Sequence, residues 1–179
     1  MAKNSAKRRS APPPPPAQSR KVAPRWAAPT TLVVSAVGLV ISLVLAYESV
    51  TAGTFSNICP ANSTVDCAKV TNSPWSKLFG IPVSYLGVLF FIGMIVLSTR
   101  WAWERGPVWL HSVRFAGIGV GLVMVVYLVW AELFRIGSIC LWCTGVHITT
   151  FILFAVVMFA WALREDADPA TLTRPKSSV

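Results

Sequence analysis

The amino-acid sequence predicts an all-α membrane protein built as a bundle of four transmembrane helices, and the pattern of charge carries this prediction. Hydrophobic residues make up 54% of the 179 residues, whereas charged residues make up only 13%. The charges are clustered, so that four segments carry none. These segments are residues 26–47, 78–99, 115–131 and 136–163. Since crossing the hydrocarbon core takes about 20 mostly apolar residues, and backbone in lipid must satisfy its own hydrogen bonds, each segment is predicted to be a membrane-spanning helix.

The first predicted helix spans residues 28–48. Its apolar stretch is longer than the core of about 7–15 residues that is typical of a cleaved signal peptide. We therefore interpret it as a retained anchor, with a signal peptide as the alternative. A basic tail over residues 1–25 precedes it and contains the run Pro12–Pro16, which favours an extended, solvated chain. We predict a disordered cytoplasmic tail here rather than a ligand for an SH3-type domain.

The other three predicted helices span residues 81–99, 113–134 and 140–163. Gly80 and Pro82 mark a bend at the start of the second helix, because proline is tolerated where its missing N–H would be unpaired anyway. The third uncharged segment is short, and apolar residues at both ends extend it. Residues 26–164 are thus predicted to form one membrane domain, and residues 165–179 a second cytoplasmic tail.

The basic residues predict how the helices are oriented. The formal net charge of +9 comes with 16 Lys and Arg residues. Seven of them precede the first helix, three lie around the second connection and three follow the last helix. Only Lys69, Lys77 and Arg135 lie in the other two connections. This alternation follows the positive-inside rule, so we predict a multi-pass plasma-membrane protein with both termini in the cytoplasm, in contact with lipid and not with nucleic acid.

The predicted topology places all four cysteines on the extracytoplasmic side, where disulfides are tolerated. Cys59 and Cys67 lie in the extracytoplasmic loop 49–80, and Cys140 and Cys143 lie where the last helix begins. Near the end of the loop, the apolar residues predict an interfacial half-helix that caps the bundle. These residues are Trp75, Leu78 and Phe79.

The Cys140–Cys143 pair has the spacing of a disulfide that is repeatedly formed and broken. Ser138 is a candidate helix cap just before it. Backbone N–H groups at a helix start favour negative charge, which stabilises a thiolate there. The seven residues between Cys59 and Cys67 allow a folded-back loop to bring these cysteines together. A mobile pair of this kind suits thiol–disulfide exchange with a soluble partner.

The electrons of the helix pair need an acceptor in the bilayer, and a quinone is the natural candidate because it is lipid-soluble and accepts two electrons and two protons. Cys143 lies deeper along the helix than Cys140 and is expected nearest the quinone. His147 follows four residues later on the same face, and an ionisable residue at membrane depth is a functional candidate. The alternative is a neutral histidine bonded to a neighbouring helix. Glu132 is a second candidate for proton transfer, although a simple interfacial position is equally consistent.

The cysteines and their neighbouring motifs together resemble the bacterial form of the vitamin K epoxide reductase family. The motifs are Cys59-x7-Cys67, Cys67-Ala-Lys-Val-Thr-Asn-Ser73-Pro-Trp75, Phe79-Gly-Ile-Pro82-Val-Ser-Tyr-Leu-Gly87 and Cys140-Leu-Trp-Cys143-Thr. The resemblance covers roughly residues 28–163. It implies a four-helix bundle whose extracytoplasmic loop caps the active site.

The resemblance also implies a role for individual residues. Cys140 and Cys143 match the active-site pair beside the quinone, while Cys59 and Cys67 match the pair that shuttles electrons from a thioredoxin-like partner. Two further positions match: Ser73 to a loop serine near the active site, and His147 to the quinone pocket. We also assign Phe79 and Trp142 to the quinone site. Only a short polar segment follows Leu163, so the partner is expected to be a separate DsbA-like protein and the acceptor menaquinone or ubiquinone.

Three other interpretations account for four extracytoplasmic cysteines. A quinone reductase of the DsbB type has an unrelated fold, and its Cys-x-x-Cys pair precedes the wider pair along the chain. A structural zinc site would use four thiolates, but no metal is predicted here. A scaffold with two static disulfides would not require the Cys-x-x-Cys spacing at a helix start.

Overall fold

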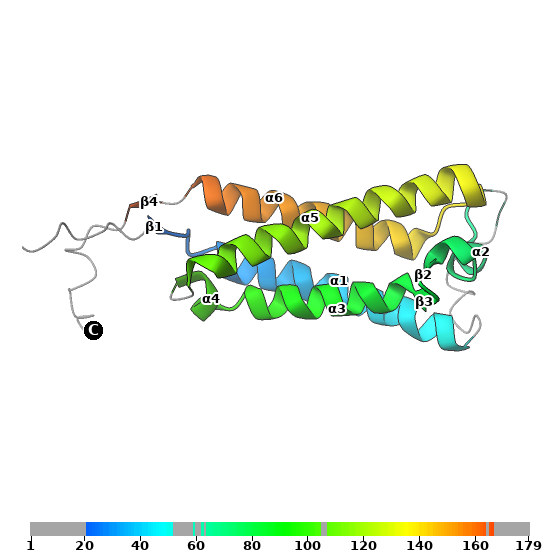
Figure 1. Ribbon diagram of the computed structural model, residues 1–179, viewed down its shortest axis with the longest axis horizontal. Coiled ribbons are helices and arrows are strands. Elements are labelled where there is room, and N and C mark those ends of the chain that lie inside the picture. The colour runs from blue at the N-terminus through cyan, green and yellow to red at the C-terminus, as the bar shows by residue number, and fades with distance from the viewer. Residues whose placement is uncertain are drawn as a thin grey trace, which may run out of the picture.

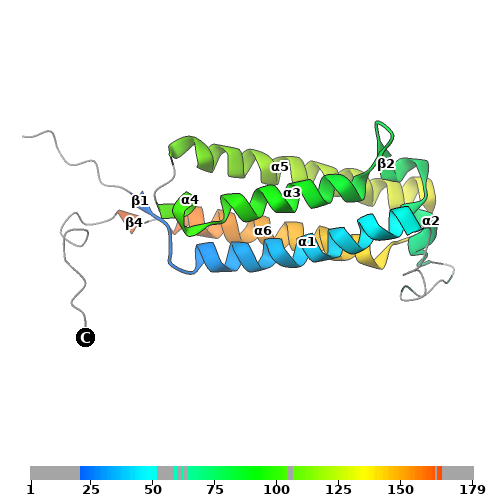
Figure 2. The ribbon, with the colours of Figure 1, turned by 90° about the horizontal axis from the view of Figure 1, so that it is seen from below.

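The computed structural model describes residues 21–51, 59, 62, 64–104, 107–163 and 165–166, and this part of the chain is an all-α bundle. Four apolar helices run alternately up and down its long axis (Figures 1 and 2). They are α1 (Ala27–Thr51), α3 (Val83–Leu97), α5 (Val108–Ala131) and α6 (Leu141–Ala162). A π-helical segment, η3 (Glu132–Ile136), continues α5.

The two ends of the bundle differ in what they hold. One end carries α4 (Arg100–Glu104) together with β1 (Lys21–Val22) and β4 (Glu165–Asp166). The two strands pair antiparallel, with Lys21 opposite Asp166, so the segments before the first helix and after the last lie side by side. The predicted tail 1–25 is therefore paired at Lys21–Val22, whereas residues 1–20 lie outside the described part. The opposite end holds α2 (Cys67–Thr71) and the connection from α5 to α6 (Figure 2).

Three segments of the described chain are long and apolar enough to cross a membrane: α1, Trp109–Ile136 and α6. The all-α membrane fold predicted from the sequence is confirmed. The second predicted helix is shorter than expected, since α3 has 15 residues and spans about 22 Å at 1.5 Å per residue. That is less than the hydrocarbon thickness of about 30 Å, so a fourth span stays a prediction.

Two local structures shorten α3. Before it, β2 (Lys77–Leu78) and β3 (Ile81–Pro82) form a small hairpin. Its turn is Phe79–Gly80, with φ of 52° and 83°, and two successive positive φ values are typical of two-residue hairpin turns. After the helix, the Ser98 N–H bonds to the Ile95 and Val96 carbonyls. The helix expected over 81–99 therefore begins two residues later and ends two residues earlier than predicted.

The side chains divide between a narrow core and an apolar outer surface. The core away from the cysteines contains Ala27, Ala28, Met94, Trp103, Ile118, Leu153, Val157 and Ala160. Large apolar residues on every long helix face outward, among them Val40, Leu89, Val123 and Phe159. A soluble protein rarely exposes apolar surface this extensively, so this outer surface suits contact with lipid.

At the end that carries β1, β4 and α4, Arg114 joins three helices. Its guanidinium carbon lies 3.8 Å from the centre of the Trp103 ring on α4. Its Nη1 lies 3.0 Å from His111 Nδ1 on α5, and its Nη2 donates to the Leu97 carbonyl at the end of α3. The side chain is almost fully buried. The cation thus satisfies a helix-terminal carbonyl, which favours positive charge.

Candidate active site

The Cys140–Cys143 pair is placed by the turn between η3 and α6. Gly137 adopts a left-handed φ of 67°, and its N–H bonds back to the Glu132 carbonyl at 2.9 Å. The chain reverses there, and α6 begins after Cys140. Cys140 itself caps the helix, because its Sγ accepts the Cys143 N–H at 3.2 Å. The prediction that Ser138 is the cap is wrong. Its hydroxyl instead accepts a hydrogen bond from the Lys69 ammonium at 3.1 Å.

The two thiols of this pair face different surroundings. Both are free, but Cys140 is fully buried, whereas Cys143 is half-buried. Cys140 belongs to a buried cluster at the outer end of the bundle, against which Cys143 packs; we name it the cysteine cluster. Its buried members are Leu45, Cys59, Cys67, Val70 and Cys140. A thiol in such a cluster is shielded from water on all sides.

The loop pair is brought into the same cluster. Cys59 and Cys67 form a disulfide with a Cα–Cα distance of 6.1 Å, and both are buried. The bonding partner of each loop cysteine is thus the other, and the structure does not hold the four thiolates that a zinc site requires. Within the described residues, no group of three or more His, Cys, Asp or Glu is arranged to hold a metal ion.

Backbone hydrogen bonds dock the loop against the segment that precedes Cys140. The Ile139 N–H bonds to the Thr64 carbonyl at 2.9 Å, and the Asp66 N–H bonds to the Ile139 carbonyl at 3.1 Å. Asp66 also caps α2 by accepting the Lys69 N–H at 2.9 Å. Since Cys67 is the first residue of α2, these bonds fix it next to Cys140. Residues more than 70 positions apart are thus held in one small volume.

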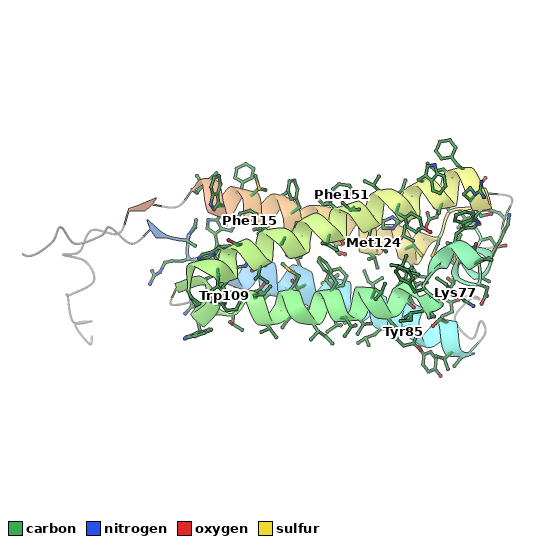
Figure 3. All side chains as sticks on the ribbon, viewed as in Figure 1. Lys77, Tyr85, Trp109, Phe115, Met124 and Phe151 are labelled. Atoms are coloured by element: carbon green, nitrogen blue, oxygen red, sulfur yellow. A yellow bond between two sulfur atoms is a disulfide. The ribbon has the colours of Figure 1, made fainter. Side chains whose placement is uncertain are left out.

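A cavity of about 560 Å³ lies beside Cys143, between α1, α3, α5 and α6. Ligand pockets usually have volumes of about 300–1,000 Å³. The lining is mostly apolar and includes Leu45, Val70, Leu86, Phe90, Met124, Leu128 and Val146. Figure 3 shows Met124 midway along the bundle, between Lys77 and Tyr85 near the cysteine end and Trp109 and Phe115 near the other. The titratable side chains in the described lining are Glu132, Cys143 and His147.

His147 and Glu132 both enter this cavity from buried positions. The exposed fraction is 6% for His147 and 5% for Glu132. His147 lies one turn beyond Cys143, and its Nε2 has no hydrogen-bond partner in the described part of the chain. Glu132 is held through its backbone, because its carbonyl accepts the Gly137 N–H at 2.9 Å and the Ser138 N–H at 3.3 Å. An unpaired imidazole nitrogen beside a thiol is ready to bond a ligand.

Three of the residues assigned to the quinone site do not line the cavity. Phe79 is 96% exposed at the tip of the β2–β3 hairpin, because the hairpin turn directs it outward. Trp142 packs against the cysteine cluster instead. Ser73 caps a 3₁₀ turn, η2 (Pro74–Ser76), by accepting the Trp75 N–H at 3.2 Å. It lines a separate groove of about 360 Å³ beside Lys69 and Arg135.

Glu48 is a buried acidic residue near the cysteine cluster that the sequence patterns do not predict. It lies in the last turn of α1, with an exposed fraction of 3%. Its only signal in the sequence is an acidic residue that directly follows a long uncharged stretch. Such a position is normally attributed to the membrane interface, and only the packing of α1 shows that the carboxyl group points inward.

Comparison with known proteins places the chain in a family. No curated protein sequence matches it. The sequence profile of the Vitamin K epoxide reductase family matches residues 29–158, a range that includes all four cysteines and His147. The motifs that suggested this resemblance are thus supported by a match over most of the membrane domain. The chain therefore belongs to the vitamin K epoxide reductase family, and it is a membrane thiol–disulfide oxidoreductase.

Proposed function

We propose that this protein reoxidises a separate DsbA-like or thioredoxin-like protein outside the cytoplasm and passes the electrons to a quinone, which supports disulfide formation in exported proteins. One observation carries the proposal. The Cys140–Cys143 pair contacts the loop disulfide through the cysteine cluster and reaches the apolar cavity through Cys143. A pair in this position can take electrons from one side and release them on the other.

The loop pair is the entry point in this proposal. The partner's dithiol reduces the Cys59–Cys67 disulfide, and the resulting loop thiols then reduce an oxidised Cys140–Cys143 pair by exchange through a mixed disulfide. The shared cluster supports the second transfer, because Cys67 and Cys140 are buried together.

The cavity suits a quinone ring. Its walls are mostly apolar, and Cys143 and the unpaired Nε2 of His147 are among the polar groups of the lining that can orient a ring carbonyl. When bound, a quinone supplies an acceptor for two electrons and two protons. Cys143 and Cys140 lose two electrons and become a disulfide. His147 and Glu132 are positioned to hold and move the protons that leave the thiols, and neither menaquinone nor ubiquinone is favoured by these residues.

The membrane arrangement follows from the charge pattern. We infer four spans in the plasma membrane, with α3 completed by its flanking residues, both termini in the cytoplasm and the cysteine cluster outside. The pairing of β1 with β4 supports a common side for the two termini. Residues 1–25 and 165–179 are proposed to form cytoplasmic tails, of which residues 1–20 and 167–179 lie outside the described part of the chain.

The proposal is tested with purified protein, a reduced DsbA protein and a short-chain quinone. We expect quinone reduction that depends on both substrates and is abolished in Cys143→Ser. The loop variant Cys67→Ser should also stop oxidation of DsbA, but dithiothreitol should still drive quinone reduction in it. If Cys143→Ser continues to reduce quinone, the mechanism is wrong.

A further inference from the structure

Glu48 is a buried carboxyl group that the reaction described above leaves unused. Neither of its carboxyl oxygens has a hydrogen-bond partner among the described residues, although the side chain is only 3% exposed. Burying a polar group without a partner costs free energy, and such groups are rare enough to require an explanation. A surface carboxylate would be solvated and a structural one would be bonded, so the surroundings of Glu48 fit neither role.

The position of Glu48 relates it to the thiols. Leu45 lies one turn earlier on the same face of α1 and belongs to the cysteine cluster with Cys67 and Cys140. The Glu48 carboxyl group is also close enough to Cys143 to act on it electrostatically. In Figures 1 and 2 the end of α1 lies at the same end of the bundle as α2 and the start of α6.

A second buried carboxyl group, Glu132, lines the cavity together with Cys143. Glu48 does not line the cavity. It lies in the last turn of α1, one turn beyond Leu45 of the cysteine cluster. The two acidic residues therefore approach the region of the helix pair from different elements, Glu132 from η3 and Glu48 from α1.

We propose that Glu48 is the proton carrier for thiol–disulfide exchange between the loop pair and the helix pair. The inference rests on the proposed function, in which loop thiols reduce an oxidised Cys140–Cys143 pair. Attack requires a thiolate, and water that could take the proton is excluded from the cysteine cluster. The Glu48 carboxylate is unpaired and lies one helical turn from Leu45 of the cysteine cluster, so it is a group that can accept the proton there.

Protons and electrons balance in this exchange when the Glu48 carboxylate accepts and returns a proton twice. Glu48 takes the proton of one loop thiol, and the thiolate attacks the Cys140–Cys143 disulfide. A mixed disulfide forms, and the helix thiolate that leaves takes the proton from Glu48. The second loop thiol then gives its proton to Glu48, and its thiolate attacks the loop sulfur of the mixed disulfide. The loop disulfide forms, and the second helix thiolate is protonated by Glu48, so that two electrons and two protons have moved.

The test follows a single transfer without quinone. Full-length protein with both pairs oxidised is mixed with a reduced DsbA protein, quenched in acid at intervals, and labelled with a maleimide, and mass spectrometry then shows which pair carries the label. In the wild type, label should appear on Cys140 and Cys143. In Glu48→Gln it should appear on the loop cysteines and reach the helix pair about 100-fold more slowly, since a positioned proton carrier contributes about 10²–10⁴-fold.

Two variants separate proton transfer from structural damage. Glu48→Asp keeps a carboxyl group and should transfer within about tenfold of the wild-type rate. Ser35→Ala removes another buried, unpartnered polar group of α1 away from the cysteines and should behave as wild type. Transfer in Glu48→Gln at the wild-type rate would overturn the inference.

If Glu48→Gln does not accept electrons even on the loop cysteines, that variant is structurally damaged and Glu48→Asp becomes the deciding variant. Loss of transfer from the loop pair to the helix pair in Glu48→Asp would also overturn the inference. The proposed function fails separately, if wild-type protein accepts electrons from DsbA but reduces no quinone.

Discussion

His147 is the residue whose surroundings best separate a structural role from a functional one. A structural histidine would be hydrogen-bonded to a neighbouring helix, as buried polar groups generally are. In the described structure its Nε2 has no partner and the side chain lines the cavity one turn beyond Cys143. The spacing in the sequence predicted the shared face, whereas the missing partner is visible only in the packed bundle.

Replacing His147 with Phe tests whether its imidazole binds the quinone. Phe fills the space but cannot hydrogen-bond, so we expect the KM for quinone to rise about fivefold, the equivalent of a hydrogen bond worth ~1 kcal/mol. Steady-state quinone reduction driven by a reduced DsbA protein measures it. Thr149→Ala is the control, because Thr149 is buried on the same helix but bonds its own backbone. An unchanged KM would assign His147 to packing.

Gly137 is the residue on which the position of the cysteine pair depends. Its φ of 67° is a conformation that costs a residue with a Cβ about 1–2 kcal/mol. We expect Gly137→Ala to lower the free energy of unfolding by this amount. Gly119→Ala is the matched control, since Gly119 lies inside α5 with nothing within 4 Å of an added Cβ and should gain about 0.5–1 kcal/mol. Denaturation in detergent compares the two, and equal stabilities would contradict the assigned role of the turn.

At the scale of elements, α3 departs most from its prediction. The uncharged segment 78–99 predicted a long helix, but the β2–β3 hairpin and the Ser98 cap leave 15 residues. Hydropathy reports which residues prefer lipid, and it is insensitive to a turn whose residues are themselves apolar. Phe79 illustrates this, since it was assigned to a half-helix and to the quinone site, whereas its hairpin turn directs it outward. The α1–α3 contact, by contrast, has its closest approach at one small residue.

That residue is Gly38, where an added Cβ would overlap the Phe91 ring. Phe91 is fully buried and cannot move aside easily, so we expect Gly38→Ala to destabilise the bundle by about 1–3 kcal/mol, as is usual for overpacking. Thermal unfolding in detergent provides the measurement. Gly93→Ala on the exposed face of α3 has open space for the methyl group and should raise the melting temperature slightly, because alanine is more stable than glycine inside a helix. A loss of stability confined to Gly93→Ala would show that the helices pack differently.

At the scale of the whole molecule, the two ends of the bundle should lie on opposite sides of the membrane. Lys77 and Trp109 are exposed and lie at opposite ends (Figure 3). In a background with all four native cysteines replaced by serine, Lys77→Cys should react with a membrane-impermeant maleimide in intact cells. Trp109→Cys should react only after the membrane is permeabilised. Labelling of both positions from outside would contradict the predicted topology.

Local rules of hydropathy, charge and helical period are sufficient to predict the all-α membrane fold, the common end of the two cysteine pairs and the shared face of Cys143 and His147. The packed bundle was needed to show that Cys140 caps its own helix, that Glu48 points inward, and that Ser73, Phe79 and Trp142 do not line the cavity. Burial and hydrogen-bond partners depend on residues distant in the chain, which no local pattern encodes.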